Sequence, residues 1–77
     1  MNKMRRKKLQ TIFDQLYDLS EQLEEIKEEE EEVLENIPEN LQGSERYEQC
    51  ESAIYELGEA IETIASACES IEVAIDR

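Results

Sequence analysis

The side chains that could do chemistry are carboxylates and two thiols, and no histidine accompanies them. The chain of 77 residues holds 21 Asp and Glu residues, together with Cys50 and Cys68. Without histidine, the usual general base and the commonest nitrogen ligand for metals are missing. The sequence also has no glycine-rich phosphate loop and no nucleophile elbow. We therefore expect no catalysis, no cofactor and no metal site.

The densest run of carboxylates extends from Glu28 to Glu32, and in a helix it would go round the axis without converging on one point. Such a run usually forms a solvated helix face. A functional alternative is that Glu28, Glu29, Glu31 and Glu32 imitate the phosphates of nucleic acid and bind a basic protein. Glu30 falls on a core position, where it could fix the register, bind an arginine of a partner or join a carboxylate of a second copy. We favour a side chain that reaches water, because a buried charge without a partner is costly.

The two cysteines are predicted to be small buried hydrophobic residues. Both fall on core positions of one expected helix, 18 residues apart, which corresponds to about 27 Å. They cannot form a disulfide with each other within a straight helix. In the expected cytoplasmic compartment both would be reduced thiols.

The elements that position these side chains are two long helices with matching heptad repeats. The first helix is expected over residues 3–35 and the second over residues 45–76, and in each half a core residue recurs at alternating steps of three and four. The first series is Leu9, Ile12, Leu16, Leu19, Leu23, Ile26, Glu30, Val33 and Ile37. The second series is Tyr47, Cys50, Ile54, Leu57, Ile61, Ile64, Cys68, Ile71 and Ile75.

Other small and aromatic residues lie beside these two stripes. Phe13, Tyr17 and Leu34 widen the first stripe, which favours more than one neighbouring helix. In the second helix, alanine recurs every seven residues at positions 53, 60, 67 and 74, and this column predicts a close approach of another helix on one flank. Gly58 either permits a tight helix crossing or is a tolerated surface glycine that costs about 1 kcal/mol relative to alanine.

The break between the helices spans residues 36–44. Pro38 disfavours helical geometry at the preceding residue and has no amide hydrogen to donate. Gly43 tolerates a positive φ, and Ser44 is a good N-cap for the second helix. Residues 38–42 are expected to form a single 3₁₀ or α turn, with Leu41 packed against the end of the bundle.

Charge is distributed unevenly along the chain. The net charge is −13, but five of the eight basic residues lie between Lys3 and Lys8, so residues 9–77 carry a net charge of −18. Such a surface repels nucleic acid and anionic membranes, and it attracts a basic protein. In a hairpin, the basic start would lie beside Glu69, Glu72 and Asp76. No apolar segment follows the basic start as in a secretory signal, and none could span a bilayer, so we expect a cytoplasmic protein.

These patterns predict an all-α fold, an antiparallel two-helix coiled-coil hairpin that forms a single domain. A 77-residue hairpin buries little surface, so we expect it to dimerise into a four-helix bundle. The residues predicted to form the self-association core are Leu16, Leu23, Ile54, Leu57, Ile61, Ile64 and Ile71.

The segment at the break, Asn36-Ile-Pro-Glu-Asn-Leu-Gln-Gly-Ser-Glu-Arg-Tyr-Glu48, resembles a motif of a known group of sequences. These are small, uncharacterised helical-hairpin proteins of Gram-positive gut bacteria, their prophages and other mobile elements. The similarity extends along most of the chain through a basic start, Leu/Ile/Glu repeats, this motif and an Ala/Ile/Glu helix. The resemblance implies a helical hairpin and a mobile-element setting, and it supplies no activity.

The favoured function is a noncatalytic protein-interaction module, an accessory factor of a phage or mobile element. Its candidate partner-binding residues are the four exposed glutamates of the acidic run together with Pro38, Leu41, Arg46 and Tyr47 in and after the loop. The alternative is an acidic inhibitor that imitates nucleic acid and blocks a basic host or defence protein. A weaker alternative is a nucleic-acid or membrane contact through the basic start, which deletion of residues 1–8 would abolish.

Overall fold

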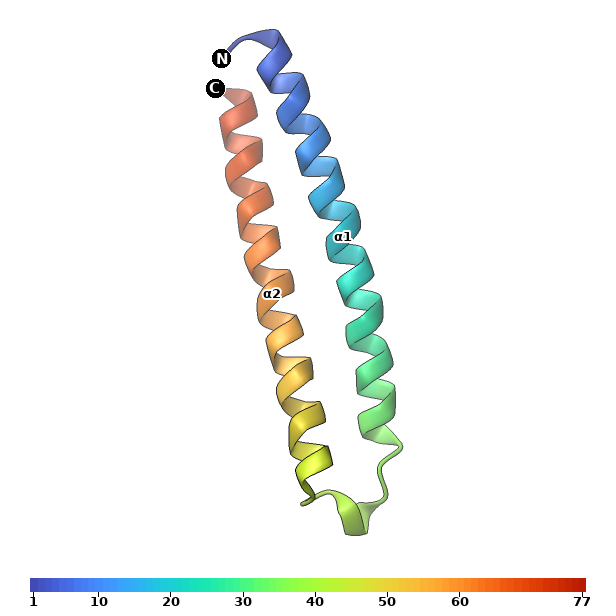
Figure 1. The fold of residues 1–77 in the computed structure, drawn as a ribbon. Helices are drawn as coiled ribbons and strands as arrows, with labels where there is room; N and C mark the ends of the chain where they lie inside the picture. Colours follow the sequence, from blue (N-terminus) through green and yellow to red (C-terminus); the bar gives the residue numbers. More distant parts are fainter.

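Two long antiparallel helices joined by one short loop form the whole molecule. The computed structural model describes all 77 residues, with α1 at Lys3–Glu35, a single 3₁₀ turn η1 at Glu39–Leu41, and α2 at Glu45–Asp76. The chain termini lie together at one end and the loop lies at the other (Figure 1). The hairpin is a rod of 60 × 15 × 12 Å. These helix bounds coincide with the ranges expected from the sequence.

Side-chain caps fix where each helix begins. The Asn2 Oδ1 atom accepts a hydrogen bond of 2.8 Å from the backbone N–H of Arg5, and the Ser44 Oγ atom accepts one of 3.3 Å from the N–H of Tyr47. Both caps satisfy an amide that has no partner within its helix. The prediction that Ser44 caps the second helix is therefore confirmed.

The loop contains the predicted single turn, but its side chains and glycine differ in detail from the expectation. The 3₁₀ turn closes with a 2.8 Å hydrogen bond from the Leu41 N–H to the Pro38 carbonyl. Leu41 keeps about half of its surface exposed, so it is only partly packed. No residue of the chain has a positive φ, and the conformational freedom of Gly43 is therefore not used.

We call the facing sides of α1 and α2 the seam. All nine residues of the predicted α2 series lie in it, and none of them is exposed. Cys50 and Cys68 are the only buried residues, each 8% exposed. The remaining members are all half-buried: Tyr47, Ile54, Leu57, Ile61, Ile64, Ile71 and Ile75. The predicted register of the second helix is thus confirmed.

The predicted register of α1 is wrong at every second position. Four residues placed in the core by the sequence pattern are exposed, namely Ile12 (45%), Leu19 (52%), Ile26 (48%) and Val33 (41%). Their places in the seam are taken by the residues that directly follow them, Phe13, Ser20, Lys27 and Leu34, which are half-buried. The remaining members of the seam on α1 are Leu9, Leu16, Leu23, Glu30 and Ile37. The physical reason is that α1 carries apolar residues in three adjacent columns, although Ser20 and Lys27 interrupt one of them, and a single neighbouring helix can contact only two columns.

Lys27 leaves the seam past Gly58. The Nζ atom of Lys27 forms an ion pair of 3.3 Å with Glu31, the only ion pair of the chain within 4 Å. A Cβ atom added to Gly58 would meet the Cε atom of Lys27 at 3.6 Å, an ordinary van der Waals distance. The glycine therefore leaves room for the aliphatic part of the lysine, while the backbones themselves do not require a close crossing at this point.

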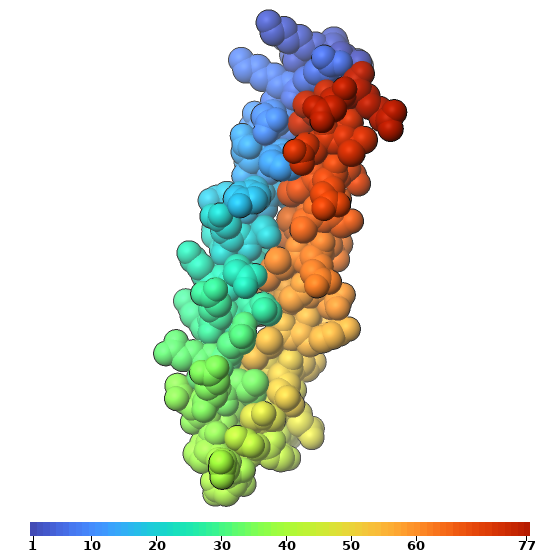
Figure 2. All heavy atoms as spheres, turned by 180° about the vertical axis from the view of Figure 1, so that it is seen from behind, coloured from blue at the N-terminus to red at the C-terminus, as the bar shows by residue number.

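The seven residues predicted to form the self-association core all lie half-buried in the seam. They contribute to the contact between the two helices of one chain. Figure 2 shows the side chains of the two helices in contact along the length of the rod. Because only two of 77 residues are buried, the hairpin has a seam but no closed core.

We predict that Ile61→Asp largely unfolds the hairpin. Ile61 lies half-buried near the middle of the seam, and the aspartate would lose apolar contact and place a charge against the facing helix. The expected loss is about 2–4 kcal/mol, which is most of the stability of so small a domain. Circular dichroism would report the loss of helix. Ser66→Asp, on the exposed side of the same helix, should leave the signal intact; an unchanged signal for Ile61→Asp would refute this core assignment.

We predict that Gly58→Ala stabilises the hairpin. Alanine favours helix by about 1 kcal/mol relative to glycine, and its methyl group would contact the flexible lysine at an ordinary distance. For a chain of this size the melting temperature should rise by about 4–8 °C. Gly58→Leu should lower it, because the larger side chain occupies the path of Lys27. A lower melting temperature for the alanine variant would mean that the two helices approach each other more closely here than the structure has them.

Candidate interaction surfaces

One flank of the hairpin presents large apolar side chains from α1. Ile12, Leu19, Ile26 and Val33 recur every seven residues, and each precedes a seam residue by one position. Together they form a stripe along α1, and each keeps between 41% and 52% of its surface exposed. Exposed apolar residues scattered singly are ordinary, whereas four of them in one column of a helix form a candidate interaction surface.

The alanine column of α2 lies on the same flank. Alanines 53, 60, 67 and 74 also precede seam residues by one position, and in antiparallel helices this shared offset places both columns on one side. A hollow of about 390 Å³ brings the columns together near the loop, because Val33 and Ala53 both line it. We call the combined surface the apolar flank; its members are Ile12, Leu19, Ile26, Val33, Ala53, Ala60, Ala67 and Ala74.

Few charges border the apolar flank. The next column outward on each helix is mostly uncharged, with Gln15, Gln22, Gln49, Thr63 and Ser70. In these columns and in the apolar flank itself, the only acidic residues are Glu29 and Glu56. Three basic residues, Arg5, Lys8 and Arg46, continue the same columns at the two ends. This half of the surface therefore departs from the strong negative charge of the whole chain.

The opposite flank is acidic. The ion pair of Glu31 with Lys27, together with the contact of Lys27 with Gly58, shows that the positions after the seam residues of both helices meet on that side. The columns there hold twelve carboxylates, which we call the acidic flank: Asp14, Glu21, Glu24, Glu28, Glu31, Glu35, Glu48, Glu51, Glu62, Glu69, Glu72 and Asp76. Ten of these side chains are exposed, and Glu24 and Glu31 are half-buried.

The predicted glutamate candidates do not form one site. Glu28 and Glu31 belong to the acidic flank, Glu29 borders the apolar flank, and Glu32 lies on the outer side of α1 between them. The structure contains no group of three or more acidic, cysteine or histidine residues arranged to hold a metal ion. The run goes round the helix, as expected from its length.

Glu30 lies in the seam and contacts Cys50. The thiol of Cys50 donates to the backbone carbonyl of Glu30 and to its Oε2 atom, both at 3.5 Å. Both residues also line the 390 Å³ hollow, so the carboxylate reaches the open side of the seam. Burial, followed by the hydrogen bond to Glu30 and its negative charge, raises the pKa of the Cys50 thiol, and the Arg46 guanidinium opposes this effect. Sequence reasoning identified both residues separately but missed their pairing, because it depends on the register between the helices.

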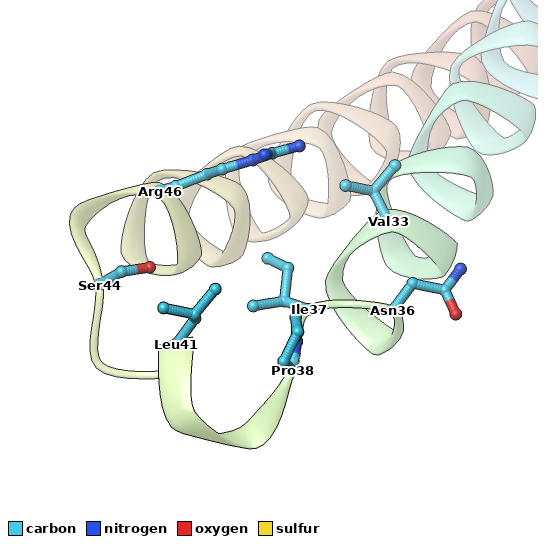
Figure 3. Close-up of a pocket in the computed structure, with 7 residues that line it drawn as sticks. All are labelled: Val33, Asn36, Ile37, Pro38, Leu41, Ser44 and Arg46. Atoms are coloured by element: carbon cyan, nitrogen blue, oxygen red, sulfur yellow. The ribbon is translucent and has the colours of Figure 1, made fainter.

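The loop forms a second hollow, of about 280 Å³. Three of the predicted candidates, Pro38, Leu41 and Arg46, line it together with Val33, Asn36, Ile37 and Ser44. The side chains of Ile37 and Leu41 lie close together below α2, and Arg46 extends along α2 towards Val33 (Figure 3). Tyr47 does not line this hollow; it is half-buried and belongs to the seam.

The basic start lies at the end of the rod where the two termini meet (Figure 1). All five basic residues between Lys3 and Lys8 are exposed, and none forms an ion pair within 4 Å of Glu69, Glu72 or Asp76. Their proximity to the acidic end of α2 thus adds no direct contact. Neither helix has a stretch both long enough and apolar enough to cross a membrane.

We predict that Glu30→Gln makes Cys50 react with a thiol reagent at lower pH. Removing the carboxylate charge lowers the raised pKa of the thiol, so the thiolate forms at a lower pH. The reaction rate with a disulfide reagent would be measured against pH in a Cys68→Ala background. Glu31→Gln removes the same charge one residue away and should shift the profile less. Equal shifts for both variants would contradict a specific effect of Glu30.

Comparisons with protein families, with curated proteins and with solved structures found no match to this chain. The function must therefore be argued from the two flanks, the loop and their charges.

Proposed function

We propose that this chain is a noncatalytic protein-interaction module that self-associates and presents an acidic surface to a basic partner protein. The observation that carries the proposal is the separation of two surfaces on one rod. The acidic flank holds twelve carboxylates, whereas the side that contains the apolar flank holds three acidic residues: Glu29, Glu56 and Glu30, which reaches this side from the seam. A surface that served only solubility would not need this separation, because charges of both kinds would be mixed over all exposed positions.

Self-association is supported by how little the hairpin buries by itself. Each helix has one neighbour, two residues are buried, and ten large hydrophobic residues remain exposed. A helix with apolar residues in three adjacent columns, as α1 has at 9 and 16, at 12 and 19, and at 13 and 34, is typical of bundles in which it contacts two other helices. We infer a homodimer in the form of a four-helix bundle, in which the acidic flanks remain on the outside.

A basic partner is supported by the length and charge of the exposed surface. The acidic flank runs from Asp14 to Glu35 on α1 and from Glu48 to Asp76 on α2, along most of the 60 Å rod. Such a field steers a positively charged protein toward the complex and repels nucleic acid. The resemblance of the loop motif to hairpin proteins of mobile elements supports an accessory role in a phage or a similar element.

The second candidate function is an inhibitor that imitates nucleic acid. It is favoured by the same row of carboxylates, because a row that extends along most of the 60 Å rod can occupy a groove that a basic protein uses for nucleic acid. The two functions differ in what the partner does with its basic surface. Only the inhibitor would compete with DNA or RNA for the captured protein.

The proposal predicts a partner whose capture depends on salt and on the acidic flank. The chain would be used as bait in a bacterial lysate at low and high salt, beside a variant with Glu28, Glu31, Glu51 and Glu62 all changed to Gln. Capture should fall at high salt and in this variant, since exposed charges supply the attraction. Leu41→Ala should leave capture intact.

Three other outcomes would change this interpretation. Capture that resists salt and is lost in Leu41→Ala would mean that the loop hollow is the binding surface. Displacement of the captured protein by added DNA would favour the inhibitor. Capture that is equal for the wild type and the four-residue variant at every salt concentration would contradict a role for the acidic flank.

A further inference from the structure

We infer that the apolar flank is the surface on which a second copy of this chain packs, which assigns a specific face to the self-association in the proposed function. The stripe of α1 and the alanine column of α2 together define this face. The acidic flank then stays free for a partner. The inference rests on the proposed self-association. It adds an assignment of the residues that contact the second copy.

The first support is the mismatch between the seam and the apolar pattern of α1. Within one hairpin, the seam accepts Ser20 and Lys27, whereas Leu19 and Ile26, directly before them, stay about half exposed. A free hairpin covers only about half of the surface of these large apolar side chains. A second hairpin on this flank buries the rest, and the exposed apolar column of α1 then has a neighbour.

The second support is the combination of shapes on the flank. Large side chains stand along α1, and small ones line α2 at the same seven-residue spacing. Alanines let a facing helix approach more closely than leucine or isoleucine would, and such spacing matches a helical partner that runs along the whole rod. A second copy supplies two helices of the same length and the same heptad spacing.

The third support is electrostatic. Two chains with a net charge of −13 repel each other, so copies can meet only where few acidic residues lie. The side of the rod with the apolar flank holds Glu29, Glu56 and the Glu30 carboxylate that reaches it from the seam, against Arg5, Lys8 and Arg46. Of all the sides of the rod, this one is nearly neutral, and it is therefore the side on which a second copy meets the least repulsion.

The fourth support is length. The residues of the apolar flank recur over residues 12–33 of α1 and 53–74 of α2, which is about 32 Å along each helix. A short peptide or a single turn of a partner would cover only part of this length.

The test uses two exposed alanines of the same helix. Ala60 lies in the middle of the apolar flank, and Ala65 lies on the acidic side of α2; both are exposed in the hairpin. Ala60→Glu and Ala65→Glu introduce the same side chain and the same charge. In a free hairpin their effects would be alike, so a difference between them reports what covers the flank.

Sedimentation equilibrium would give the mass over a range of concentrations, with circular dichroism on the same samples. The wild type should form a dimer with twice the 9.0 kDa chain mass. Ala60→Glu should weaken the dimer by at least about tenfold, because it places a charge in an apolar contact, whereas Ala65→Glu should not. A double variant with larger changes, Leu19→Glu combined with Ile26→Glu, should weaken the dimer as Ala60→Glu does. Its matched control is Tyr55→Glu with Val73→Glu, two other exposed apolar residues.

Each remaining outcome decides the matter. Loss of helix in Ala60→Glu but not in Ala65→Glu also supports the inference, because an exposed alanine has no packing to lose within one chain. Dimers that are equally strong in both variants overturn this face and leave self-association standing. A wild type of 9.0 kDa at every concentration overturns self-association itself. If that monomer needs Leu19 and Ile26 to capture another protein, a different partner occupies the flank.

Discussion

The structure depends on one constraint: each helix has a single neighbour within the chain. A helix in a larger domain buries its apolar side against several elements, but here α1 and α2 can only use each other. The seam between them leaves Cys50 and Cys68 as the only buried residues. Everything else follows from how the remaining surface is divided. Four large apolar residues of α1 that the seam does not accept, Ile12, Leu19, Ile26 and Val33, lie on one flank, and most carboxylates lie on the opposite flank.

The two charged residues of the seam, Lys27 and Glu30, are accommodated because their side chains reach solvent. Lys27 leaves past Gly58 toward Glu31, and Glu30 turns toward the thiol of Cys50 beside an open hollow. Neither side chain is a fully buried charge, which would cost far more than a hairpin of this size can offset. They leave on different sides, Lys27 on the acidic flank and Glu30 on the flank that carries Val33 and Ala53. Two charged residues at core positions of the heptad repeat therefore do not prevent the two helices from packing along the whole seam, because both side chains reach solvent.

How far the fold could be predicted from the sequence differs between the two helices. In α2 a column of alanines stands beside the core, so the large residues define one register and the structure has that register. In α1 the residues at 12, 19, 26 and 33 are more apolar than those at 13, 20, 27 and 34, and the choice between them depends on where the other helix lies. Sequence periodicity shows which columns of a helix are most hydrophobic, but it does not show which of them contacts the other helix. The pairing of Glu30 with Cys50 was out of reach for the same reason, whereas the cap at Ser44 was local and predictable.

The arrangement of the chain as a single seam with one closed end has a consequence for how it opens. Each stretch of one helix contacts only the stretch of the other helix that faces it, so the hairpin can open in steps along its length, unlike a globular domain with one shared core. At the loop end the two helices are tethered by nine residues, and opening there must strain or break the turn at Glu39–Leu41. At the other end the termini are held by side-chain contact alone, and the five basic residues of the start form no ion pair there. Separation of the two helices should therefore begin at the termini and advance toward the loop. Protection of the backbone amides against hydrogen exchange should rise from the termini to the loop.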